Sequence, residues 1–117
     1  MIQPIAFRDI LDLERWLEAH HSGAAELWLR IFRKASGVPS IDWNDCVLAC
    51  LAWGWIDSHK RAWDDQSYVQ RITPRRPNSN WSQRNIRLAE ELIASGRMHP
   101  PGLARIEHAR STGRWRS

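Results

Sequence analysis

Apolar residues recur every three or four positions in four stretches of the chain, a spacing that places them on one face of a helix. The pattern predicts helices over residues 7–21, 40–53 and 78–95, and a short last helix that opens at Pro100. Asp9 and Asp42 are expected N-caps, because a carboxylate accepts the free N–H groups of a first helical turn. Ser79 and Asn80 are the cap-type residues in front of the third helix.

In three shorter stretches the side-chain pattern repeats every two residues, as it does in strands. Residues 26–34 predict a strand with two largely apolar faces, and residues 55–63 and 68–73 predict a hairpin whose turn is 64–67. Pro74 and Pro77 each lack a backbone N–H and are not expected to continue a central strand. We therefore predict an α+β fold, in which about four helices pack on a small antiparallel sheet of three or so strands.

Composition narrows the class of protein. The chain has 117 residues, 43% hydrophobic and 26% charged, which predicts a single globular domain over residues 1–117 and argues against a disordered chain. The longest apolar stretch, Cys46 to Ile56, is too short to cross a bilayer, so no membrane insertion is expected. Two cysteines and the lack of a secretory signal predict a cytoplasmic protein, with a monomer as the default.

The charge is unevenly distributed along the chain. Arginine supplies fifteen of the 17 Lys and Arg residues, and the formal net charge is +4. Residues 1–60 hold six basic and eight acidic side chains, whereas residues 61–117 hold eleven basic and five acidic ones. A basic second half favours an anionic partner, although a high arginine content can also reflect genome composition.

Five segments form a specific combination: Leu27–Arg30, Gly54–Ser58, Arg71–Ser82, Gly96–Met98 and Gly113–Trp115. The second reads Gly-Trp-Ile-Asp-Ser, and the third contains Thr-Pro-Arg-Arg-Pro and ends in Trp-Ser. Together they resemble the YdeI/OmpD-associated family, whose members are also labelled bacteriocin-protection proteins. The resemblance runs from about Pro4 to Trp115, almost the whole chain.

The resemblance implies a bacterial protein without a defined catalytic activity. It connects the chain with tolerance of bacteriocins or cationic peptides and with outer-membrane porins. Members of the family continue beyond the Gly-Arg-Trp segment into a helical region, so this chain is expected to correspond to the part before that extension. Ile72 stands where the family has Phe, an apolar exchange that concerns packing.

The strongest candidate site comprises the hairpin and the arginine-rich segment that follows it. Arginine binds phosphate or carboxylate with two parallel hydrogen bonds, a helix N-terminus offers free N–H groups, and tryptophan offers an apolar wall. The candidate ligand-binding residues are Trp55, Asp57, Lys60, Arg71, Thr73, Arg75, Arg76, Ser79, Trp81 and Asn85. The alternative is a structural network, in which Arg75 or Arg76 pairs with Asp57, Asp64 or Asp65 and Ser79 or Asn80 caps the helix.

Two further groups of residues have the chemistry of a site, but structural explanations for them are stronger. Asp57, Ser58 and His59 have the residue types of a hydrolytic triad, but neighbours in a strand point to opposite faces and no nucleophile elbow is present. Asp57, His59 and Arg61 are instead expected on one hairpin face, beside Arg71 and Thr73. Cys46 and Cys50 form a single weak zinc motif, and burial as small apolar residues is the stronger interpretation.

These observations favour a non-enzymatic binding or stress-tolerance domain with an anion-binding surface of arginine and tryptophan. Its partner is expected to be an anionic small molecule or a protein, and no cofactor, metal or catalytic residue is assigned. A nucleic-acid-binding module that uses the same arginines on phosphates and Trp81 for stacking is the alternative. An enzyme with Asp57 as its general base is the third.

Overall fold

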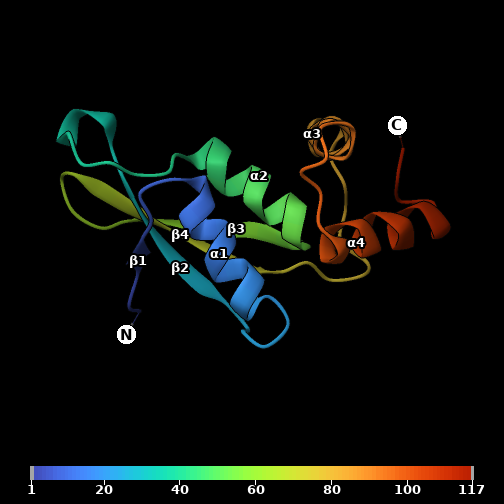
Figure 1. The fold of residues 1–117 in the computed structure, drawn as a ribbon. Coiled ribbons are helices and arrows are strands. Elements are labelled where there is room, and N and C mark those ends of the chain that lie inside the picture. The colour runs from blue at the N-terminus through green and yellow to red at the C-terminus, as the bar shows by residue number, and fades with distance from the viewer. Residues whose placement is uncertain (1, 117) are drawn as a thin grey trace.

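The structure is a computed structural model, and it describes residues 2–116. Figure 1 shows the order of its elements along the chain. The strands and helices are β1 (Ile5–Ala6), α1 (Ile10–His20), β2 (Leu27–Phe32), the 3-10 turn η1 (Lys34–Ser36), α2 (Trp43–Trp53), β3 (Trp55–Ala62), β4 (Ser67–Pro74), α3 (Gln83–Ala94) and α4 (Pro100–Ser111). The predicted α+β class is therefore confirmed, with four α-helices in the described chain.

The sheet differs from the prediction in size and in strand direction. It has four strands in the order β1-β2-β4-β3, and β1 pairs with β2 in parallel while the other pairs are antiparallel. The two-residue β1 was missed because so short a strand has no recognisable alternation. Pro74 was not expected to continue a central strand, but it is the last residue of β4 and pairs with Trp55.

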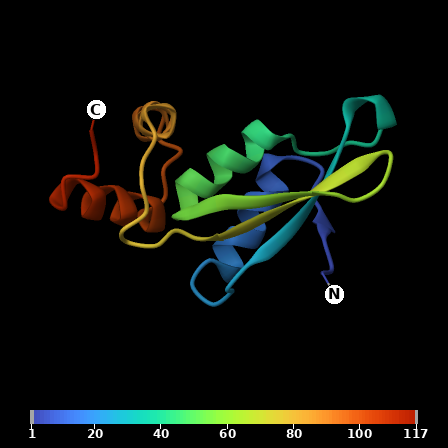
Figure 2. The ribbon, with the colours of Figure 1, turned by 180° about the vertical axis from the view of Figure 1, so that it is seen from behind.

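The two faces of the sheet have different surroundings. Leu27, Leu29 and Ile31 on β2 are buried in the core with residues of α1 and α2, whereas the alternate β2 residues are only half-buried. Figure 2 shows the strands from the side that these two helices leave open. We call the covered side the inner face and the open side the outer face. The strict alternation of β2 thus sets which side chains meet the core.

The helix α2 is the centre of the core, as its continuous apolar sequence predicts. It packs against α1, α3, α4 and β3, and seven of its eleven residues are buried. The helices α3 and α4 lie beyond the end of the sheet, past the C-terminus of α2 (Figure 1). Gly102 allows this approach, because a Cβ there would lie 2.5 Å from the carbonyl oxygens of Leu51 and Ala52.

Some side chains and caps are placed differently from the sequence-based expectation. Ser82, rather than Ser79 or Asn80, caps α3, since its hydroxyl accepts the backbone N–H of Asn85. Trp43 begins α2 and is 44% exposed, although it opens an apolar helix. Leu103 on α4 is an exposed apolar residue, whereas Ile106 of the same helix is buried. No helix in residues 2–116 is long and apolar enough to cross a membrane.

The predicted cap of α2 is present and can be tested. Asp42 accepts the backbone N–H of Asp45, and the carboxylate of Asp45 accepts the backbone N–H of Asp42 in return. Replacing Asp42 with alanine removes an N-cap and should lower the free energy of unfolding by about 1 kcal/mol in urea denaturation. Asp65→Ala is the matched control, because Asp65 is exposed and takes part in no ion pair within the described chain. Equal losses in the two variants would contradict the capping role.

Candidate functional site

Four arginines gather at the end of β4 and beside α4. Arg71, Arg75, Arg76 and Arg105 line one pocket of about 410 Å³, together with Thr73 and small apolar or proline residues. Three of these arginines follow one another along β4 and the segment after it, whereas Arg105 comes from α4. We call this the arginine pocket. Arg105 joins the other three arginines only because α4 docks at the end of the sheet.

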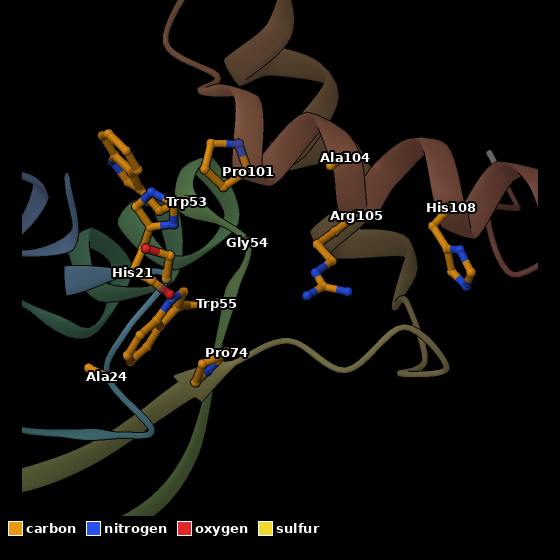
Figure 3. Close-up of a pocket in the computed structure, with 11 residues that line it drawn as sticks. His21, Ala24, Trp53, Gly54, Trp55, Pro74, Pro101, Ala104, Arg105 and His108 are labelled. Carbon is orange, nitrogen blue, oxygen red and sulfur yellow. The ribbon is translucent and has the colours of Figure 1, made fainter. Parts of the chain in front are cut away.

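A second pocket adjoins the first and is shown in Figure 3. It measures about 550 Å³, shares Pro74 and Arg105 with the arginine pocket, and is also lined by His21, Trp55 and His108. Arg105 and His108 point from α4 toward the end of β4 and the segment that follows (Figure 3). We call the two pockets together the groove. Its walls thus combine cationic or titratable side chains with small apolar surfaces.

Arg75 lies at the back of the arginine pocket and is only 2% exposed. Its Nη1 donates to Ser79 Oγ at 3.0 Å and to the carbonyl oxygen of Asn80 at 3.2 Å, while its Nε has no hydrogen-bond partner among residues 2–116. Its guanidinium carbon lies 4.0 Å from the centre of the Trp81 ring, a cation–π contact. Burial lowers the pKa of Arg75 to about 10, so the side chain remains charged at neutral pH.

No carboxylate neutralises Arg75, Arg76 or Arg105 within ion-pair distance in residues 2–116. Arg71 is the exception, since its Nε donates to Glu26 Oε1 at 2.6 Å. Neither pocket has an aspartate or glutamate among its lining residues. A buried charge is screened less by solvent and salt than an exposed one. The groove is therefore a region of positive potential, and a bound anion would neutralise its charge.

The structure places some of the predicted site residues in the groove and the others elsewhere in the fold. Arg71, Thr73, Arg75 and Arg76 line the arginine pocket, and Trp55 lines the adjoining pocket with its ring almost fully buried. The structural alternative, in which Arg75 or Arg76 pairs with an aspartate, does not hold for the described chain, where Asp64 pairs with Arg30 at 2.7 Å.

Asp57 and Lys60 lie apart from the groove, on the inner face of the sheet. Asp57 pairs with Ile72 on the inner face, and a β-bulge between Asp57 and Lys60 shifts the register so that Lys60 pairs with Gln70 and lies on the inner face as well. Arg71 is on the outer face, so the expected grouping of Asp57 with Arg61, Arg71 and Thr73 is wrong. Asp57 instead accepts a hydrogen bond from Trp43 Nε1 at 3.2 Å.

Ser79, Trp81 and Asn85 support the groove from behind and do not line it. Ser79 and Trp81 contact the guanidinium of Arg75, and Asn85 gives its backbone N–H to the α3 cap. The Trp81 ring also packs edge-on against Trp115, with 5.1 Å between the ring centres. Ser79 and Trp81 therefore hold Arg75 in place, whereas Asn85 belongs to the cap of α3.

Three groove residues were missed at the sequence level. Arg105 and His108 lie on α4, whereas His21 is the C-cap residue of α1, far away in the chain. The signal for Arg105 was the basic charge of the second half, which does not say which arginine faces which strand. The docking of α4 supplies that information.

The two cysteines are buried, as expected for small apolar residues. The pKa of the Cys50 thiol is raised well above its ordinary value, chiefly by a hydrogen bond with Cys46 and in addition by burial. A buried thiol with a raised pKa is unreactive. In the part of the chain that the structure describes, no three His, Cys, Asp or Glu side chains are grouped to hold a metal ion.

Comparison with known proteins gives one match. The model of a family described as "Domain of unknown function (DUF8412)" matches residues 5–105, which include the sheet, the arginine-rich segment and Arg105. No curated protein and no solved structure matches the chain.

Proposed function

We propose a function from the geometry of the groove, since the family to which the chain belongs is described as a domain of unknown function (DUF8412). The proposed function is non-enzymatic binding of a ligand through an anionic group, a phosphate or a carboxylate, in the arginine pocket. Arg76 and Arg105 contact the anion directly, Arg71 and Thr73 add hydrogen bonds, and Arg75 supplies positive charge from behind.

One observation supports this proposal most strongly. Three arginines meet around one pocket without a carboxylate partner in the described chain, and one of them is almost fully buried. Burying an uncompensated charge is unfavourable for folding. A surface that served only stability would pair such charges, whereas a bound anion would satisfy them and stabilise the folded state.

If the groove binds an anion, the affinity should depend strongly on Arg105 and Arg76. In a titration with inorganic pyrophosphate followed by backbone amide NMR, we expect shifts around Arg71–Arg76 and the first turns of α4. Arg105→Ala and Arg76→Ala should each weaken the binding about tenfold or more, because each removes charge-assisted hydrogen bonds.

Arg87→Ala is the matched control, since it removes one exposed arginine of α3 and leaves the groove intact. Its affinity for pyrophosphate should equal that of the parent chain. No binding by the parent chain at millimolar pyrophosphate, or equal loss in all three variants, would contradict the proposed groove.

The resemblance to the YdeI/OmpD-associated family suggests where this binding acts. We propose a role in bacterial tolerance of bacteriocins or cationic peptides, in which the groove engages an anionic ligand or partner protein. The enzyme alternative has less support, because Asp57 lies outside both pockets of the groove and is bonded to Trp43. Tolerance that persists in a strain carrying Arg76→Ala and Arg105→Ala would argue against a role for the groove in it.

A further inference from the structure

The outer face of the sheet presents alternating aromatic and guanidinium groups. On β2 it displays Trp28, Arg30 and Phe32, all half-buried although no helix of the described chain covers this face (Figure 2). On β4, Val69 lies in register between Arg30 and Arg61 and is fully buried. The long side chains therefore lie flat across the strands, since extended ones would leave Val69 exposed.

These arginines lie over the aromatic rings. The guanidinium carbon of Arg30 is 4.4 Å from the centre of the Phe32 ring, and that of Arg61 is 5.4 Å from the centre of the Trp28 ring. Arg30 is fixed further by hydrogen bonds to Ser67 Oγ and Asp64 Oδ2. The face thus offers flat guanidinium and indole surfaces, which are the groups on which proteins stack unpaired bases.

Arg71 connects this face with the groove. It lies on the outer face of β4, paired with Trp28 across the strands, and it also lines the arginine pocket. A ligand held at Arg76 and Arg105 that extends past Arg71 would therefore reach Trp28 and Arg61 on the open sheet. The anion pocket and the stacking surface form one continuous strip.

We propose that the ligand of the groove is single-stranded nucleic acid, with a backbone phosphate in the arginine pocket and neighbouring bases stacked on Trp28 and Arg61 of the outer face. This inference rests on the proposed anion-binding function and names its ligand class. It uses a surface other than Trp81, which the sequence had suggested for stacking and which is occupied by Arg75 and Trp115.

An acidic peptide is the competing ligand, and the surface favours it less. Carboxylates need free cations, but along the outer face Arg30 and Arg71 are already paired with Asp64 and Glu26. What remains there is chiefly flat stacking surface, which suits bases better than carboxylates. A glutamate-rich peptide therefore serves as a comparison ligand in the test.

The test measures binding of a short fluorescein-labelled oligothymidylate by anisotropy, and of pyrophosphate by NMR, with the full chain. Trp28→Leu keeps an apolar side chain and removes the ring, and Arg61→Ala changes an exposed residue without a carboxylate partner in the described chain. Each should weaken oligothymidylate binding about fivefold or more, as loss of one stacking contact does, and leave pyrophosphate binding unchanged. Arg105→Ala should weaken both.

Salt dependence separates the two parts of the strip. Each phosphate contact on a single strand contributes about −0.7 to the slope of log affinity against log salt. Arg105→Ala should therefore reduce the magnitude of that slope by about 0.7, whereas Trp28→Leu should lower the affinity with the slope unchanged.

The outcomes distinguish the two proposals. Pyrophosphate binding together with oligothymidylate binding that is insensitive to Trp28→Leu and Arg61→Ala would overturn the nucleic-acid proposal and leave the anion groove standing. A glutamate-rich peptide that binds as tightly and with the same dependence on Trp28 would also overturn it. Failure of both ligands to bind the parent chain would overturn both proposals.

Discussion

Gly102→Ala should destabilise the protein by about 3 kcal/mol, although alanine is the better helix former by about 1 kcal/mol. Gly102 lies in the first turn of α4, where α4 crosses the C-terminus of α2. A Cβ there would lie 2.5 Å from two backbone carbonyl oxygens and 2.6 Å from Met98 Sδ. The backbone oxygens cannot move without shifting a helix, so the contact between α2 and α4 must open.

The same substitution should also weaken anion binding. Arg105 follows Gly102 by one helical turn, so displacement of α4 moves this arginine away from the arginine pocket. Urea denaturation and a pyrophosphate titration measure the two effects. Gly23→Ala is the control, because Gly23 has no heavy atom within 4 Å of an added Cβ and should change stability by less than about 0.5 kcal/mol. A Gly102→Ala variant as stable as the parent would show that α4 does not dock as described.

Replacement of Arg75 should separate its packing from its charge. Arg75→Ala removes the side chain that fills the space between Trp81, Ser79 and the end of β4, and should cost about 3 kcal/mol in urea denaturation. Arg75→Met keeps most of that volume and eliminates an uncompensated buried charge, so its loss should be less than half as large. The remaining loss comes from the two hydrogen bonds that methionine cannot make to Ser79 and Asn80.

Anion binding should respond differently to these variants. Arg75→Met leaves Arg76 and Arg105 in place but removes the positive charge behind them, so pyrophosphate affinity should fall while the fold persists. Equal destabilisation by methionine and alanine would indicate that the charge itself stabilises the fold through Trp81. In that case Arg75 would be a structural residue, and only Arg71, Arg76 and Arg105 would belong to the anion site.

The local sequence determined the elements of this protein and several of their ends. Helical periodicity placed the four helices, Asp9 and Asp42 marked two caps, and Gly54 ends α2 with a φ of 75°. These features depend on interactions between residues close in sequence, so spacing and residue type suffice to predict them. The same holds for Arg71, Thr73, Arg75 and Arg76, which reach one pocket because they share a short extended segment.

Tertiary structure decided which of these residues act together. A bulge between Asp57 and Lys60 placed Lys60 on the inner face together with Asp57, and the docking of α4 brought Arg105 and His108 to the groove. Whether an arginine is buried without a carboxylate, as Arg75 is, depends on neighbours from distant segments and cannot be read from residue type. The sequence therefore determined the helices, the strands and the excess of positive charge, and the packing of α4 against the end of the sheet determined where that charge forms a site.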